Sequence, residues 1–176
     1  MYGYYKQQHK VFISFHHYDD QKYKDYIDNN ICSNVIYKSV TLGEYSSDNS
    51  EVYIKRLIRE EIVSDSSVGV VLVATNTKNR KHVDWEIYAG LRVSVNGSSG
   101  FVGIFLPTMR KADGGKYYYV DMPGRLADNI CSGYADFYDG DYVIDYFDSI
   151  IERDFNNRIE RRSKINNSRI QMQRNL

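Results

Sequence analysis

The stretch "SVGVVLVAT" (residues 67–75) decides the fold class of this 176-residue chain. It is an unbroken apolar run rich in valine, which is typical of a strand buried on both faces of a sheet. The helical pattern "HVDWEIYAGLRVSV" (82–95) follows it, and then a second apolar run, "GFVGIFLP" (100–107), stops at Pro107. A strand, a helix and another strand in this order predict a parallel sheet with 67–75 at its centre.

The flanking sequence extends the same alternation. Strands are predicted at 10–16 and 34–40, helices at 21–31 and 51–62, with Asp19 and Asp20 capping the first helix and Ser50 starting the second. After Pro107 the pattern predicts a long loop over 108–129, an edge strand within 132–139 and a closing helix over 142–159. The chain is therefore predicted to be an α/β protein, with a central, mostly parallel sheet and helices on both faces.

One domain is expected over residues 1–160, since the sequence shows no repeat and no linker. Residues 161–176 form a basic, polar tail that is expected to fray or to dock elsewhere. This tail is also a candidate for self-association. The 17 tyrosines point the same way, because tyrosine favours interfaces.

Composition excludes several classes of protein. With 23 basic and 23 acidic residues the net charge is zero, so no attraction to nucleic acid is expected. No apolar run reaches the ~18–20 residues of a membrane span, and the first residues lack the apolar core of a signal peptide. Cys32 and Cys131 suit a reducing compartment, although a single bridge between them stays open. We expect a soluble cytoplasmic protein.

Ligands of such sheets bind beyond the carboxyl ends of the strands, where neighbouring connections diverge. There is no Gly-x-Gly-x-x-Gly and no Walker-type loop, so a Rossmann dehydrogenase or a P-loop NTPase has no support. The four histidines lack metal-ligand spacing, so no metal is expected. The proximity of Ser14 and His16 in the sequence is too slight a signal for a nucleophile–base pair.

Glu86 stands out within the helical pattern. On a helical wheel Val83, Ile87 and Gly90 mark the packed face, and Glu86 lies at its shoulder near the end of the central strand. A carboxylate there would be half sheltered at the rim of the crevice, whereas Trp85 turns away toward a rim or a protein contact. The alternative is that Glu86 complements the helix dipole and stays in water. Geometry alone leaves both interpretations open.

Four blocks together resemble a known family: "KVFISFHHYDD" (10–20), "GEYSSDNSEVYIKRLIREEI" (43–62), "SSVGVVLVATNTKNRKHVDWEIYAGL" (66–91) and "MPGRLADNICSGYADFYD" (122–139). The chain resembles the TIR-like family of Thoeris anti-phage proteins over residues 10–148. The most specific block runs from 70 to 87, and the last block is typical of the subfamily.

This resemblance implies a flavodoxin-like, three-layer TIR-like domain. It implies an enzyme that cleaves NAD+ at the nicotinamide–ribose bond on infection. The product would be a cyclic ADP-ribose-type signal or an ADP-ribose conjugate that activates a separate effector. NAD+ is then the substrate and no cofactor is required. The expected partners are NAD+, a phage-derived trigger, the effector and further copies of the chain, with no nucleic acid and no membrane.

The family's essential glutamate falls on Glu86, which the resemblance makes the catalytic residue. His82 occupies a position where the family often has an aromatic residue. The residues implied in substrate binding lie at the first strand end, in the loop after the second strand and on the helix of Glu86: Phe15, His16, Asp20, Glu44, Ser46, Asn49, His82 and Trp85.

Two other interpretations stay open. The first is a catalytically silent TIR-like scaffold or sensor, which recognises a phage component and assembles through its tyrosine-rich surface. The second is a nucleotide-binding domain with an unrelated ligand. The sequence contains no phosphate-binding loop that would support it.

Overall fold

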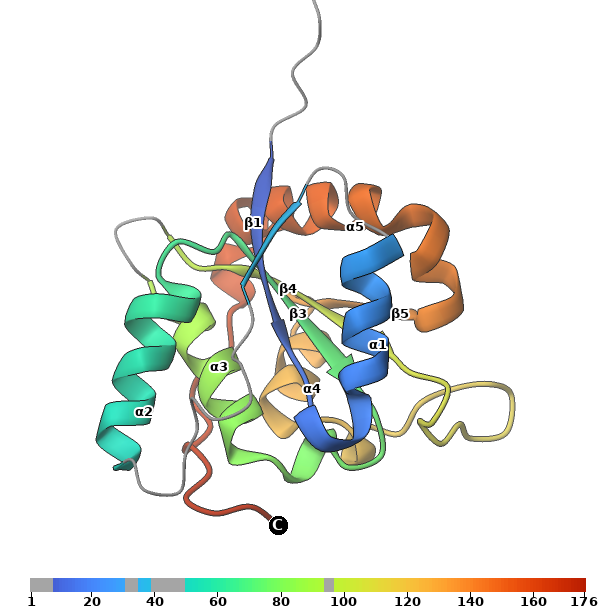
Figure 1. The fold of residues 1–176 in the computed structure, drawn as a ribbon, viewed down its shortest axis with the longest axis horizontal. Coiled ribbons are helices and arrows are strands. Elements are labelled where there is room, and N and C mark those ends of the chain that lie inside the picture. Colours follow the sequence, from blue (N-terminus) through green and yellow to red (C-terminus); the bar gives the residue numbers. More distant parts are fainter. Residues whose placement is uncertain (1–7, 31–34, 39–49, 94–96) are drawn as a thin grey trace, which may run out of the picture.

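A computed structural model describes residues 8–30, 35–38, 50–93 and 97–176, and its centre is a five-stranded, all-parallel sheet (Figure 1). The strand order is β2-β1-β3-β4-β5. The strands are β1 (His9–Ser14), β2 (Val35–Lys38), β3 (Val68–Val73), β4 (Gly100–Phe105) and β5 (Asp136–Asp139). The predicted α/β class, the central place of β3 and the edge place of β5 are confirmed.

Helices cover both faces of this sheet, which completes the three layers of a flavodoxin-like, TIR-like fold (Figure 1). One face carries α1 and α5, and the other carries α2, α3 and α4. The helices are α1 (His17–Asn30), α2 (Glu51–Leu57), α3 (Lys81–Leu91), α4 (Gly124–Cys131) and α5 (Gly140–Glu160). Shorter turns are the π-helical η1 (Ile58–Val63), which continues α2, and the 3-10 turns η2 (Thr77–Asn79), η3 (Tyr119–Asp121) and η4 (Arg162–Lys164).

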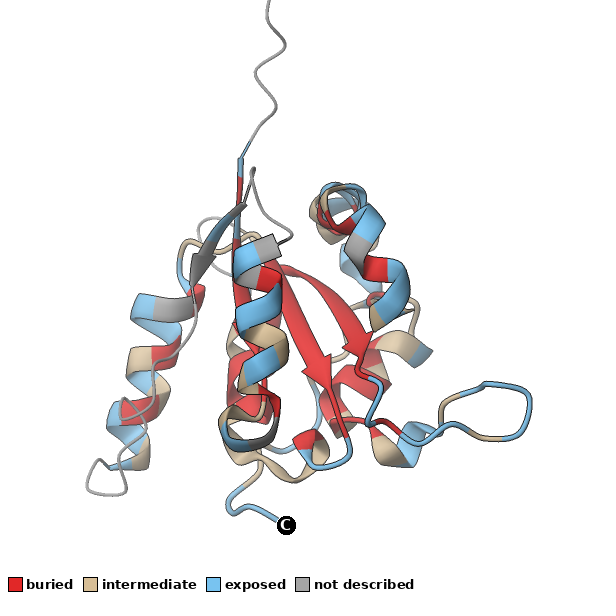
Figure 2. Ribbon diagram, turned by 45° about the vertical axis from the view of Figure 1, so that its right-hand side comes forward, coloured by how far each residue is buried: buried red, intermediate tan, exposed pale blue. Residues whose placement is uncertain are grey.

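The unbroken apolar run of β3 follows from these two layers of helices. Every residue of β3 is buried (Figure 2). Val71 and Val73 pack toward α2, α3 and α4, whereas Val70 and Leu72 pack toward α1 and α5. Since helices cover both faces of the sheet, a strand with alternating polar and apolar residues would bury its polar side chains in one of the two cores.

The loop predicted over residues 108–129 is wrong in its last part, because α4 begins at Gly124. The buried positions of α4 include Leu126 and Ala127, but also Arg125 and Asn129. Two polar side chains on the buried face interrupt the hydrophobic period by which a helix is recognised in a sequence.

Two predicted helix starts have different outcomes. Ser50 is confirmed as the cap of α2, since its Oγ accepts a hydrogen bond from the backbone N–H of Tyr53 at 3.2 Å. The predicted cap at Asp20 is wrong. The helix α1 already begins at His17, and the Asp20 N–H donates to the carbonyl of His16 at 2.9 Å. Asp20 therefore lies in the first turn.

The C-terminal segment lies along the domain instead of fraying from it. After α5 it passes α4 and α3 and ends beside η2 (Figure 1), where the Leu176 N–H donates to the carbonyl of Asn79 at 3.1 Å. Several of its polar residues find partners on the domain. Of the two alternatives predicted for the tail, fraying is therefore wrong, and the tail docks on the domain itself. A domain boundary near residue 160 stays a prediction. No helix of the described ranges is both long and apolar enough to cross a bilayer.

A buried acid on α5 makes the stability of this fold depend on pH. Asp154 is 0% exposed, and among the described residues neither of its carboxylate oxygens has a hydrogen-bond partner. Burial, and then the neighbouring Asp136, raise the pKa of Asp154 from 3.8 to about 8. Between these values the folded chain holds a proton that the unfolded chain releases. The contribution of Asp154 to stability should therefore fall as the pH rises from 4 to 8.

We predict that Asp154→Asn flattens this decline, because asparagine needs no proton to be neutral. The free energy of unfolding is measured by urea denaturation between pH 5 and 8. For wild type it should decrease with pH more steeply than for the variant, by up to roughly 1.4 kcal/mol per pH unit. Asp145→Asn, at an exposed position of the same helix, serves as the control and should keep the wild-type slope. Equal slopes for wild type and Asp154→Asn would refute the assignment.

Candidate functional site

The topology predicts a ligand crevice at the carboxyl ends of β1 and β3. The chain leaves β1 through α1 toward β2 on one side, whereas β3 pairs with β1 on the other side. Connections that diverge in this way mark the ligand site of open α/β sheets. The helix α3 follows β3 directly after η2, so its first turns border this crevice.

Ser14 and Glu86 meet at this point. Ser14 ends β1 and shares a face with Phe12, which packs toward α3. Its Oγ donates a short hydrogen bond to Oε2 of Glu86. Ser14 is 1% exposed and Glu86 4% exposed. Glu86 thus turns inward to the sheet, and the alternative of a solvated helix-start acid is wrong.

A buried carboxylate of this kind is well suited to stabilise charge electrostatically. Hydrogen bonds and charges act more strongly in a poorly solvated site than in water. The serine hydroxyl fixes one oxygen of the carboxylate in place, which removes the need to reorganise it during a reaction. The pair can stabilise a positive charge or accept hydrogen bonds from a sugar.

Two histidines lie at the starts of α1 and α3, which follow β1 and β3 in the chain. His82 lies four residues before Glu86, and therefore on the same face of α3. Burial first, and then the charges of Lys81 and His17, lower the pKa of His82 to about 4. His82 is consequently neutral at pH 7, and His17 lies near enough to act on it. The predicted substrate-binding residues include His16 but not His17. The sequence does not show which of two adjacent histidines faces the site.

The predicted residues around β1 separate onto two faces of the sheet. Phe15 is 4% exposed and packs with α1 and α5, which is the face opposite Glu86. His16 is partly exposed between β1 and α1, and Asp20 is 1% exposed within α1. The three predicted residues of the loop after β2 lie outside the described residues: Glu44, Ser46 and Asn49.

Trp85 does not lie at an open rim, so that expectation is wrong. It is 1% exposed, and its indole N–H donates to the carbonyl of Met172 at 2.9 Å. The ammonium groups of Lys55 and Lys81 lie 4.4 and 5.0 Å from the centre of its ring. The contact partner is the distant C-terminal segment of the same chain.

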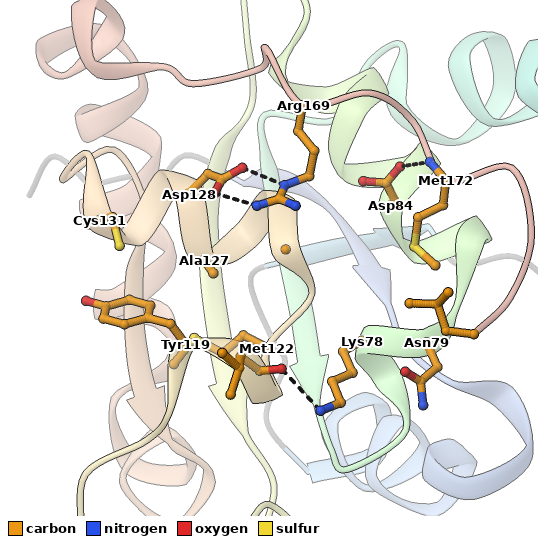
Figure 3. A pocket seen from close by; sticks show the side chains of 13 residues that line it. Lys78, Asn79, Asp84, Tyr119, Met122, Ala127, Asp128, Cys131, Arg169 and Met172 are labelled. Atoms are coloured by element: carbon orange, nitrogen blue, oxygen red, sulfur yellow. Dashed lines mark hydrogen bonds and ion pairs between the residues drawn. The ribbon is translucent and has the colours of Figure 1, made fainter.

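A separate cavity of about 640 Å³ lies between η2, η3, α4 and the C-terminal segment (Figure 3). Its cations are paired, since Lys78 contacts Asp121 at 2.8 Å and Arg169 contacts Asp128 at 2.7 Å. Only Asp84 lines it from α3 among the described residues, whereas Glu86 turns to the sheet. The described residues also contain no group of three or more His, Cys, Asp or Glu that could hold a metal. The crevice at Glu86 is therefore the candidate site.

We predict that Ser14 and Glu86 are energetically coupled. In a double-mutant cycle with Ser14→Ala and Glu86→Gln, the free energies of unfolding should deviate from additivity by about 1–3 kcal/mol, because Ser14→Ala removes the donor of this bond and Glu86→Gln removes the charge of its acceptor. Urea denaturation at pH 7 measures all four chains.

The matched control replaces Ser98, which precedes β4 at the opposite end of the sheet. The Oγ of Ser98 donates to the carbonyl of Leu91 at 3.3 Å. Ser98→Ala combined with Glu86→Gln should be additive within about 0.5 kcal/mol. Additivity of the Ser14 pair as well would show that their contact carries no energy.

We also predict that His82 makes the domain sensitive to acid. Its folded-state pKa of about 4 lies below the ordinary 6.5, so between these values the unfolded chain binds a proton that the folded chain does not. The contribution of His82 to stability should therefore fall as the pH drops from 6.5 to 4. The melting temperature of His82→Gln should fall less than that of wild type over this range, and a parallel fall would contradict the assignment.

Comparison with known families agrees with this geometry. The family model described as Thoeris protein ThsB, TIR-like domain, matches residues 12–111, which is more than half of the chain. The matched range runs from β1 past β4 and includes both Ser14 and Glu86. A search of curated proteins finds no match. The chain belongs to the TIR-like domain family of the Thoeris protein ThsB, which places it in Thoeris defence.

Proposed function

We propose that this Thoeris protein cleaves NAD+ at the nicotinamide–ribose bond after phage infection and makes a signal of the cyclic ADP-ribose or ADP-ribose-conjugate type. That signal would activate a separate effector protein in the cytoplasm. The observation that carries the proposal is the buried Glu86 carboxylate, held by Ser14 at the carboxyl ends of β1 and β3.

The chemistry needs what this carboxylate can supply. Breaking the nicotinamide–ribose bond builds positive charge on the ribose, as in glycoside hydrolysis, where carboxylates stabilise the oxocarbenium-like state. Glu86 would place its negative charge beside that ribose. Nicotinamide leaves as a neutral molecule, so no general acid is required to protonate it.

The surroundings of Glu86 fit this role. Ser14 orients the carboxylate before substrate arrives, which is the preorganised arrangement that electrostatic catalysis requires. His82, on the same face of α3, is neutral at pH 7 because its pKa is lowered to about 4. It therefore adds no positive charge that would oppose the developing cation.

A second function, a silent scaffold or sensor, is favoured by an aromatic row that runs from β5 onto α5. The rings of Tyr142 and Tyr146 stack at 4.6 Å, and Tyr138 continues the stack at 5.7 Å from Tyr142. Tyr142 and Tyr146 are about half exposed. Exposed, rigid tyrosines are well suited to protein contacts, including self-association.

The test is NAD+ consumption with mass analysis of the products, in lysates of infected cells that express wild type or Glu86→Gln. Glutamine keeps the size of the side chain and removes its charge. We expect nicotinamide and an ADP-ribose-derived product with wild type, and a loss of about 10²-fold or more in the variant.

Glu160→Gln, an exposed substitution of the same kind at the end of α5, is the matched control and should behave as wild type. Equal NAD+ consumption by wild type and Glu86→Gln would remove Glu86 from the reaction. If neither consumes NAD+ while wild type still protects the cells, the scaffold function replaces the proposed enzyme.

A further inference from the structure

The segment after α5 is bound by α4 largely through its main chain. The side-chain amide of Asn129 donates to the carbonyl of Asn166 at 2.8 Å and accepts from its N–H at 3.0 Å. Arg125 donates to the side-chain oxygen of Asn167 and to the carbonyl of Arg169, both at 2.8 Å. Bonds to main-chain atoms hold the segment as an extended chain.

The same segment is bound by α3. The Met172 N–H donates to Oδ2 of Asp84 at 2.8 Å (Figure 3), and the carbonyl of Met172 accepts from the indole of Trp85 at 2.9 Å. The side chain of Asn167 donates to the carbonyl of Tyr88 at 3.2 Å. These contacts lie on the outer side of α3, away from the sheet.

The segment also caps α3. The first N–H groups of a helix have no partner within the helix, and Arg80, at the N-cap position, provides no side-chain bond. Asn175 takes this role, since its Oδ1 accepts from the N–H of Lys81 at 2.9 Å. Asparagine is among the best capping residues. The cap is thus supplied from the far end of the chain.

A buried ion pair joins these contacts into one network. Arg125 is 0% exposed and Asp84 is 4% exposed, and Nε of Arg125 lies 2.9 Å from Oδ1 of Asp84. The remaining guanidinium donors bond oxygens of the segment, and the other oxygen of Asp84 accepts from Met172. Without the segment, these buried polar groups would lose partners they cannot replace inside the protein.

We propose that residues 166–176 form a strap that fixes the first turns of α3 and thereby sets Glu86 against Ser14. The consequence for catalysis rests on the proposed function. The strap holds Asp84, Trp85 and the amino end of α3, whereas Glu86 turns to the sheet. The strap therefore acts on Glu86 through the helix and does not contact it. Asn167 and Asn175 are positioning residues.

The test uses the full-length chain with Asn167→Ala and Asn175→Ala combined, which removes the side-chain bond to the Tyr88 carbonyl, one bond from Arg125 and the cap at Lys81. The matched control combines Gln173→Ala and Arg174→Ala, at two exposed strap positions. The side-chain amide of Gln173 donates to the carbonyl of Gln171, within the strap itself. Asn175→Asp alone is the conservative variant, since aspartate caps helices as well as asparagine.

The first readout needs no activity. Trp85 is the only tryptophan of the chain, so its fluorescence reports on the strap. In the double variant we expect red-shifted emission, stronger quenching by acrylamide and roughly tenfold faster amide exchange in α3. The control and Asn175→Asp should match wild type. Unchanged exchange in α3 of the double variant would overturn the proposal.

The second readout is NAD+ cleavage in lysates of infected cells. The double variant should lose about 10- to 100-fold in kcat with little change in KM, because displacing a catalytic group by about 1 Å can have this effect. A loosened α3 with unchanged kcat would overturn the positioning role. If wild type itself cleaves no NAD+, the proposed function has failed, and amide exchange alone then decides whether the strap fixes α3.

Discussion

The arrangement of α3 depends on the buried ion pair between Asp84 and Arg125. Removing two charges from water is costly, and a buried pair is tolerated only where further hydrogen bonds satisfy the remaining polar atoms. Here those bonds come from the C-terminal segment, whose main chain provides carbonyls to Arg125 and an N–H to Asp84. The pair therefore ties α3, α4 and the end of the chain together.

Three consecutive residues of α3 serve different neighbours because each turns by about 100° from the last. Asp84 meets Arg125, Trp85 lies under the C-terminal segment, and Glu86 meets Ser14. The helix is thus held from the sheet and from outside at the same turn. An acid beside the only tryptophan is explained by this division, since the two side chains work on different sides of the helix.

Local patterns were enough to predict the sheet, but they placed Glu86 only at the shoulder of the packed face of α3 and left its burial open. The apolar run of β3 and the helical period of α3 are both set by neighbours in the sequence. The alternation of side chains along β1 could also have identified Ser14 as a site residue. Ser14 shares a face of the sheet with Phe12, which packs toward α3, whereas Phe15 lies on the opposite face. The predicted set includes Phe15 and leaves Ser14 out.

Other features depend on partners that no local pattern contains. The helix α4 is hidden because Arg125 and Asn129 occupy buried positions, and their burial makes sense only with the C-terminal segment in place. The cover of Trp85 comes from a residue 87 positions away. From the sequence alone Trp85 is therefore expected at an exposed rim, whereas in the folded chain it is buried.

The most direct measurement of the central claim is a structure with a non-hydrolysable NAD+ analogue bound. The nicotinamide ribose is expected to lie at the carboxyl ends of β1 and β3, within hydrogen-bonding distance of Glu86. An analogue bound instead in the cavity between α4 and the C-terminal segment, with Glu86 still closed against Ser14, would contradict it.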